Sequence, residues 1–296
     1  MSESAWGFAP GDQIVPDVIA QKLLGGGEAY EAYLAFDEVL YAPIVIKIVR
    51  PDQVDSESTL RGLRREVTAL GRLEHPAVVR YFHADTDGPR PYVALENIDG
   101  PRLSSLIRRH GQLPVQQLLP LGLEIASALH YLRTRDVLHL DIKPSNVIMG
   151  SPARLIDLSV ARSEAAASEL TYPIGTDEYM APEQCNPPTG GTPGYAADMW
   201  GLGATMFHAA AGYRAFDRGT GDDDAPVESR FPQLVDDPYT LPDVVPADVG
   251  KLILSCLHPD PAGRPTPREF AESLDPLMAA MPKARLSGFK VSLTSR

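Results

Sequence analysis

The chain has 296 residues, with 27 lysines and arginines against 39 aspartates and glutamates, which gives a formal net charge of −12. This length predicts about two compact units at ~150 residues per domain, and a hydrophobic content of 44% excludes a chain that is disordered throughout. The excess of negative charge is a poor match to polyanions, so we do not expect nucleic acid as a main partner.

The two cysteines, Cys185 and Cys256, are too few for a disulfide framework or a four-thiolate zinc site, and we expect both as reduced thiols of an intracellular protein. No apolar run approaches the roughly 20 residues that cross a bilayer. The first 13 residues lack the layout of a secretory signal, and Ser2 stands where N-myristoylation requires glycine. The sequence therefore predicts a cytoplasmic protein without a membrane span.

The first third of the chain is mostly extended. Residues 1–13 are punctuated by glycine and proline and form an N-terminal lead-in, and from residue 14 to 97 short β-branched or apolar runs such as 44–50 (IVIKIVR) and 91–98 (PYVALENI) predict strands. One helix interrupts them, because apolar residues recur at helical spacing between Ser58 and Leu73, after a plausible N-cap at Ser56 or Ser58.

Beyond Gly100 the pattern turns helical. Helical periodicity predicts helices over 113–135, 196–211, 249–257 and 267–277, and a short β-rich block precedes the second of them. Residues 279–296 hold four basic residues and no acidic one, which indicates a flexible basic tail. The sequence thus predicts an α+β chain with a lead-in (1–13), a small β-rich unit (14–97), a larger helical unit (98–278) and a tail (279–296).

Three features of the first unit suggest chemistry without establishing it. Gly25, Gly26 and Gly27 lie between two extended segments, where backbone without Cβ can approach a phosphate closely. Lys47 lies inside an apolar strand, so it either reaches out to solvent or has an anionic partner. Glu66 lies on the predicted helix among arginines, where a glutamate usually belongs to a solvated face.

The strongest signal is HLDIKPSNVI, residues 139–148, followed by LIDLS, residues 155–159. The first resembles the catalytic loop H-x-D-x-K-x-x-N of serine/threonine protein kinases, with His139, Asp141, Lys143 and Asn146, and Asp157 stands at the position of the DFG aspartate. GTDEYMAPE, residues 175–183, resembles the end of the activation segment. The resemblance covers roughly residues 12 to 278 and implies the bilobal protein-kinase fold, with a small β-rich lobe bearing one key helix and a larger, mainly helical lobe.

The resemblance also implies roles for individual residues. Lys47 contacts the α- and β-phosphates of ATP and pairs with Glu66, while Asp141 accepts or orients the proton of the substrate hydroxyl. Lys143 neutralises the transferred phosphoryl group, and Asn146 and Asp157 bind Mg²⁺ or Mn²⁺. Around the nucleotide it places Leu24, Gly25, Gly26, Gly27, Ala32, Val45, Lys47, Leu95, Glu96, Ile98, Ile148 and Asp157.

The chain departs from the family pattern in the roof of the nucleotide site. Tyr30 replaces the third glycine of the loop, which makes the loop stiffer and bulkier. Ala32 and Val45 exchange the sizes usual at their two positions, and we expect them to face the same cleft so that its volume is kept.

Two further departures lie beside the catalytic loop. Leu140 replaces the arginine that normally binds a phosphorylated activation loop, so we expect activity that does not depend on that modification. Leu158 and Ser159 follow Asp157 in place of Phe and Gly; Leu158 is expected to pack with His139 and Leu70, and Ser159 to hinder the inactivating backbone flip.

Other charged residues have expected structural roles. Glu183 and Arg264 resemble the buried ion pair that ties the activation segment to the large lobe, and Asp198 is expected to accept backbone N–H bonds from the catalytic loop. The acidic stretch 217–237 is either a solvated loop or a feature that favours basic peptide substrates. The basic tail carries candidate autophosphorylation sites, and an alternative to a freely flexible tail is one that folds back on this acidic surface.

Three functions compete on this reading. The first is a serine/threonine protein kinase that uses ATP and Mg²⁺ on protein substrates, for which Lys143 and Thr176 favour hydroxyls of Ser or Thr. The second is a pseudokinase scaffold, suggested by Tyr30, Leu140 and Ser159. The third, a small-molecule kinase, is disfavoured by the segment 175–183, which is typical of peptide-binding kinases.

Overall fold

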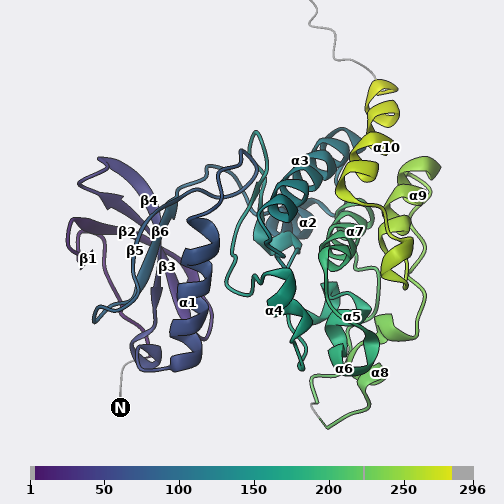
Figure 1. Cartoon of the computed structure of the whole chain (residues 1–296). Helices are drawn as coiled ribbons and strands as arrows, with labels where there is room; N and C mark the ends of the chain where they lie inside the picture. Colours follow the sequence, from purple (N-terminus) through teal and green to yellow (C-terminus); the bar gives the residue numbers. More distant parts are fainter. Residues whose placement is uncertain (1–3, 223, 282–296) are drawn as a thin grey trace, which may run out of the picture.

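The computed structural model describes residues 4–222 and 224–281. The first part of the chain forms an antiparallel six-stranded sheet of strand order β1-β2-β3-β4-β6-β5 (Figure 1). Its strands are β1 (Gln13–Val15), β2 (Val18–Gly26), β3 (Tyr30–Asp37), β4 (Ala42–Val49), β5 (Tyr81–Asp85) and β6 (Tyr92–Glu96). The extended pattern expected from residue 14 to 97 is therefore confirmed.

Residues of β3 and β4 alternate between the two faces of the sheet, as strand geometry requires. Ile44, Ile46 and Ile48 are fully buried on one face, in a core shared with Tyr33. On the other face Ala32 pairs with Lys47, and Val45 lies two residues from Lys47. Ala32 and Val45 thus lie on the same face as Lys47, as their exchange of sizes predicted.

The lead-in is packed against this sheet. Trp6 donates a hydrogen bond from Nε1 to the carbonyl of Val49 over 2.8 Å and stacks on Phe8, whose ring meets Tyr33 edge-on. The guanidinium of Arg90 lies over both aromatic rings of the lead-in. These contacts fix residues 6–8 to the small lobe.

Helix α1 (Glu57–Leu70) is the one long helix among the described residues of this lobe and corresponds to the helix expected between Ser58 and Leu73. The Ser56 side chain caps its N-terminus by accepting the N–H of Thr59. Its buried stripe packs toward the sheet and includes Leu63, Leu70 and one charged residue, Glu66. In Figure 1 the helix lies on the side of the sheet that faces the rest of the chain.

The second part of the chain is mainly helical. The four helices expected from periodicity are confirmed as α3 (Val115–Thr134), α7 (Tyr195–Ala211), α9 (Ala247–Cys256) and α10 (Pro267–Ala279). Shorter helices accompany them, namely α2 (Leu103–His110), α4 (Glu164–Ser168), α5 (Pro182–Cys185), α6 (Pro187–Gly190) and α8 (Val227–Arg230). Helices α3, α7, α9 and α10 pack together around buried side chains such as Trp200, which stacks on Phe216.

The expected β-rich block is a hairpin of β7 (Val147–Ile148) and β8 (Arg154–Leu155), preceded by a 3-10 turn at Pro144–Asn146. It lies between α3 and α7 in sequence, directly after the predicted catalytic loop. The fold is the predicted α+β arrangement of two lobes. Among residues 4–222 and 224–281 no helix is long and apolar enough to cross a membrane. Residues 282–296, which hold the basic residues of the predicted tail, lie outside the described residues, and so does its alternative fold-back.

Candidate active site

Lys47 of β4 lies at the centre of a three-residue ion cluster. Its Nζ is 2.8 Å from Oε2 of Glu66 on α1 and 2.9 Å from Oδ1 of Asp157, which follows β8. The Lys47 side chain is 14% exposed and that of Glu66 is fully buried, so Lys47 has anionic partners rather than an outward position. Three elements far apart in the sequence are therefore joined at one ammonium group.

The charges of this cluster shift one another's protonation. Burial lowers the pKa of Lys47, but the carboxylates of Glu66 and Asp157 outweigh burial and hold that pKa above its usual range. Burial raises the pKa of Asp157, but Lys47 reverses this effect and holds it below the usual range. Burial raises the pKa of Glu66. Asp157 is consequently a carboxylate at neutral pH.

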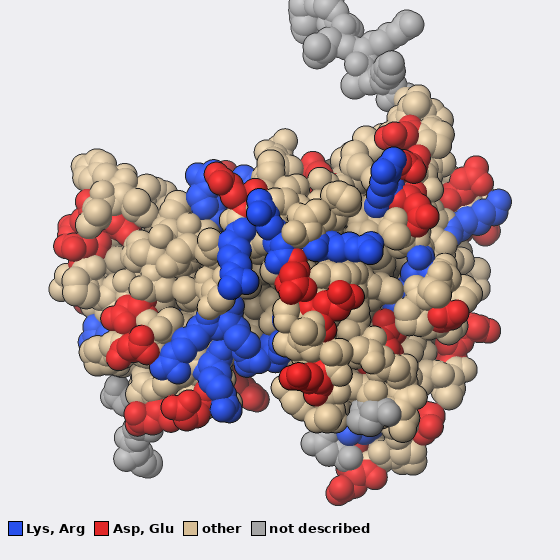
Figure 2. Space-filling view, in the orientation of Figure 1, with Lys and Arg blue, Asp and Glu red and all other residues tan. Residues whose placement is uncertain are grey.

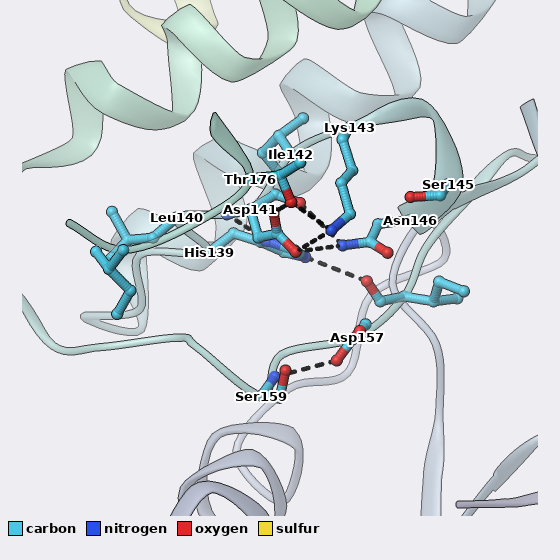
Figure 3. Close-up of polar contacts among 12 residues, drawn as sticks. His139, Leu140, Asp141, Ile142, Lys143, Ser145, Asn146, Asp157, Ser159 and Thr176 are labelled. Atoms are coloured by element: carbon cyan, nitrogen blue, oxygen red, sulfur yellow. Dashed lines mark hydrogen bonds and ion pairs between the residues drawn. The ribbon is translucent and has the colours of Figure 1, made fainter. Parts of the chain in front are cut away.

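Asp141 is the centre of a second polar cluster (Figure 3). Its Oδ2 accepts a hydrogen bond from Nδ2 of Asn146 over 2.9 Å and lies 2.8 Å from Nζ of Lys143. Its Oδ1 accepts the hydroxyl of Thr176 over 2.7 Å, and that hydroxyl also accepts Nζ of Lys143 over 2.5 Å. Asp141, Lys143 and Asn146 are thus brought together as the sequence predicted, with Thr176 as a further member.

Helix α7 holds the backbone of the predicted catalytic loop through one buried side chain. Both oxygens of the buried Asp198, on α7, accept backbone N–H groups, from His139 over 2.8 Å and from Leu140 over 2.7 Å, which confirms the role expected of Asp198. Leu140 is 2% exposed, so its side chain lies in the interior. Its backbone has a φ of 61°, a conformation that is uncommon for a residue other than glycine. The His139 ring hydrogen-bonds to the carbonyl of Ile156, which links this loop to the strand before Asp157.

Asn146 and Asp157 were predicted to hold a divalent metal, and their chemistry fits one. Asn146 uses its amide nitrogen on Asp141, which leaves its carbonyl oxygen available. Asp157 uses Oδ1 for Lys47 and the backbone N–H of Ser159, and within the described residues Oδ2 makes no hydrogen bond (Figure 3). Amide and carboxylate oxygens are the donors that Mg²⁺ prefers.

The residues predicted around the nucleotide come from both lobes. Gly25 adopts φ of +146° at the end of β2, a conformation that favours glycine, and Leu24 is about half exposed beside it. In the register of β3, β4 and β6, Val45 pairs with Leu95, so Ala32, Val45 and Leu95 share the face that bears Lys47. Glu96 ends β6, where its carboxylate accepts the N–H of Arg80, and Ile98 follows. Gly26 ends β2, Gly27 begins the turn to β3, and Ile148 lies in β7.

Tyr30 has a position that the sequence did not reveal. Its hydroxyl donates to the carbonyl of Thr59 on α1 over 2.9 Å, and its ring centroid lies 4.6 Å from Nζ of Lys47. The residue that replaces the third loop glycine therefore points to the same face as Lys47 and reaches α1.

The segment after Asp157 is anchored on the large lobe. Arg264 forms a two-pronged pair with Glu183, at 2.7 and 2.9 Å, and both side chains are almost completely buried, which confirms the expected pair. Gln184 donates from Nε2 to the carbonyls of Leu140 and Ile174, both over 2.8 Å. This second anchor was not predicted from the sequence, because an isolated glutamine has no local pattern.

Two cavities flank these clusters. One, of about 600 Å³, opens beside Lys143 and Thr176 and is also lined by Arg108, His208 and Arg214. The other, of about 500 Å³, lies between α1 and the residues after Asp157, and is lined by five arginines, Arg61, Arg64, Arg65, Arg72 and Arg162. Figure 2 shows basic side chains gathered between the strand-rich and helical parts on this face.

Comparison with known proteins agrees with the geometry. The model of the protein kinase domain matches residues 19–274. The serine/threonine-protein kinase PknB of Mycobacterium leprae is 27% identical over 254 residues, which are 82% of this chain and 40% of that protein. The serine/threonine-protein kinase PknK of Mycobacterium tuberculosis (strain H37Rv) is 31% identical over 281 residues, 88% of this chain and 24% of that protein. The chain thus spans less than half the length of these relatives.

Proposed function

The chain belongs to the protein kinase family, and from this premise we propose that it transfers the γ-phosphoryl group of ATP to serine or threonine hydroxyls of protein substrates. The observation that supports this most directly is the pairing of Lys47 with both Glu66 and Asp157. It joins the two lobes at the ammonium group that would meet the phosphates.

Each charged side chain then has one task. Lys47, oriented by Glu66, contacts the phosphates of the nucleotide, and the face with Ala32, Val45 and Leu95 covers the adenine. Asp141 accepts or orients the proton of the acceptor hydroxyl, and Lys143 neutralises charge on the phosphoryl group as it moves. The cluster does this work by position and charge, because phosphoryl transfer requires little covalent participation by the protein.

Asn146 and Asp157 are the proposed ligands of Mg²⁺ or Mn²⁺, which would neutralise the phosphate oxygens when bound. Their oxygen donors and the low pKa of Asp157 support this assignment. Isothermal titration of Mg²⁺ into a mixture of protein and ATP tests it without turnover. Asp157→Asn should weaken the metal-dependent part of ATP binding, and an unchanged titration would contradict it.

We propose further that activity does not require phosphorylation of the activation segment. Leu140 is buried and apolar where the family resemblance has an anion-binding arginine. Treatment with a phosphatase should leave the rate nearly unchanged. A large loss of rate would contradict the proposal and would direct attention to the arginines of the α1 cavity, Arg65 and Arg162 among them, as the groups that bind the phosphate.

Substrates rich in basic residues are the finer part of the proposal. Asp217, Asp222, Asp224 and Glu228 lie in the acidic stretch that follows α7, and their charge would attract a basic peptide. A peptide library phosphorylated at low and high salt tests this preference, because an electrostatic preference weakens as salt screens the charges.

A nucleotide-binding pseudokinase is the second candidate, supported by Tyr30, Leu140 and Ser159. Incubation with labelled ATP and Mg²⁺, followed by mapping of modified residues, separates the two functions. The proposed kinase labels itself or an added protein, and Asp141→Asn, which keeps the shape but not the charge of the side chain, abolishes labelling. Equal labelling by the wild-type protein and by Asp141→Asn would contradict the proposal.

A further inference from the structure

Tyr30 joins the small-lobe sheet to α1 at the edge of the Lys47 cluster. It begins β3, and its side chain lies on the same face as Ala32 and Lys47. Its hydroxyl donates to the carbonyl of Thr59 over 2.9 Å, in the first turn of α1. Burial raises the pKa of Tyr30 to about 12, although Lys47 opposes this, so the hydroxyl keeps the proton that it donates.

Gly62 makes room for this hydroxyl. It is buried in the interior of α1, where glycine is a poor helix former and needs a packing reason. A Cβ added at Gly62 would lie 3.2 Å from the hydroxyl oxygen of Tyr30, which is tighter than ordinary contact. The helix therefore has its smallest residue at the point where Tyr30 reaches it, and this is an observation independent of the hydrogen bond.

Tyr30 contacts α1 on the side of the helix that carries Glu66. Thr59 and Glu66 are seven residues apart, or about two helical turns, so both lie on one side of the helix. The ring of Tyr30 also lies 4.6 Å from Nζ of Lys47, the partner of Glu66. One side chain thus contacts both the helix that bears Glu66 and the lysine that Glu66 must meet.

We propose that Tyr30 is a positioning residue that ties β3 to α1 and holds Glu66 within reach of Lys47. The Tyr30–Thr59 hydrogen bond, called the tie below, lies within the small lobe and does not depend on a phosphate on the activation segment. Because it regulates the proposed phosphotransfer site, its effect on rate rests on the proposed function, whereas its effect on α1 does not.

Tyr30→Phe removes the hydrogen bond and keeps the ring. Loss of one such bond should lower kcat by about threefold to tenfold while the KM for ATP changes less. Tyr33→Phe is the matched control, because Tyr33 lies on the same strand but on the opposite face, where its hydroxyl bonds Glu31 away from the site. The control should keep the wild-type kcat, and an equal fall in both variants would overturn the proposal.

A double-mutant cycle separates positioning from general stability. If Tyr30 acts through Glu66, Tyr30→Phe should have little further effect on kcat in a Glu66→Gln background. Equal fold-losses in the two backgrounds would show an independent, merely structural role. Melting temperatures measured on the same four proteins identify any variant that fails to fold.

Amide hydrogen exchange tests the tie without turnover. Tyr30→Phe should speed exchange in residues 60–66 of α1, and Tyr33→Phe should not. Unchanged protection of α1 in Tyr30→Phe would overturn the inference even in an active enzyme. Conversely, if the wild-type protein transfers no phosphate but the exchange responds as expected, the proposed function fails and the tie stands.

Discussion

The hydroxyl of Thr176 donates a hydrogen bond to Oδ1 of Asp141 over 2.7 Å, which joins the segment after Asp157 to the catalytic loop. The hydroxyl oxygen of Thr176 in turn accepts a hydrogen bond from Nζ of Lys143, so one hydroxyl touches both charged groups proposed to act on the substrate. A displaced Thr176 would therefore leave Oδ1 of Asp141 without this donor, while Oδ2 keeps Lys143 and Asn146.

Thr176→Val keeps the shape of this side chain and removes its hydroxyl. Hydrogen bonds to charged groups contribute about 1.5 to 3 kcal/mol, so kcat/KM should fall by about tenfold to a hundredfold. Thr176→Ser restores the hydroxyl and should recover most of the rate. Initial rates with a fixed peptide measure both, and a fully active Thr176→Val would show that the contact is dispensable.

Glu66→Gln removes the charge that faces Lys47 within the small lobe. Lys47 then pairs with Asp157 alone, and the phosphotransfer rate should fall by roughly tenfold or more, because a buried charge pair loses one partner. Glu57→Gln makes the same chemical change at an exposed position in the first turn of α1 and serves as the control. Similar rates for the two variants would contradict the role of Glu66.

The Glu183–Arg264 pair should matter for stability rather than for chemistry. Removing one partner leaves an uncompensated buried charge, which costs about 3 to 5 kcal/mol. Urea denaturation should show this loss for Arg264→Met and for Glu183→Gln. The double variant should lose less than the sum of the two, and simple additivity would show that the pair is not coupled.

His208 should make the fold sensitive to acid. Burial, followed by the charge of Arg214, lowers its pKa from 6.5 to about 4, and Nδ1 lies 2.7 Å from the Tyr179 hydroxyl. Below pH 6.5 the unfolded chain binds a proton that the folded chain refuses, so stability is present above pH 6.5 and is lost as pH falls toward 4. The free energy of unfolding should fall by about 1 to 2 kcal/mol. This is less than the full pKa shift would give, because His208 is partly exposed and solvent screens its interactions.

The comparison of wild type with His208→Gln isolates this contribution from that of the carboxylates. Chemical denaturation between pH 7 and pH 4 should show a shallower decline for the variant. Parallel declines would mean that His208 does not titrate in this range.

The two thiols should be inert in the folded protein. Cys185 and Cys256 are at most 1% exposed, and burial raises the pKa of both, that of Cys256 to about 12. A thiol reagent such as dithiobis-nitrobenzoate should therefore react only after denaturant is added, when both groups become available. Rapid reaction of the native protein would show that one of these sites opens locally.

Motifs and periodicity predicted much of the molecule. The spacing of Asp141, Lys143 and Asn146 is local, so one short loop brings them together, and the long helices follow from the apolar repeat of each segment. The pairing of Lys47 with Glu66 was available only through the family resemblance, because nothing near Glu66 in the sequence distinguishes it from a solvated glutamate.

The remaining features depend on contacts between distant residues. Tyr30 reaches Thr59 across 29 positions and Gln184 reaches Leu140 across 44, and no local pattern records such a meeting. Helix α2 (Leu103–His110) could not be predicted from periodicity, because its eight residues contain too few turns to show a helical repeat. The packing of Trp6 and Phe8 on the sheet was hidden for the same reason as Tyr30.

The two tryptophans of the chain give each lobe its own natural fluorophore. Trp6 stacks on Phe8 and hydrogen-bonds to β4 of the small lobe, and Trp200 is enclosed in the helical core beside Arg264. Trp6→Phe would leave an emission signal from the helical lobe alone, and Trp200→Phe one from the strand-rich lobe alone. The unfolding of each lobe could then be followed separately by tryptophan fluorescence in one intact chain, without any attached dye.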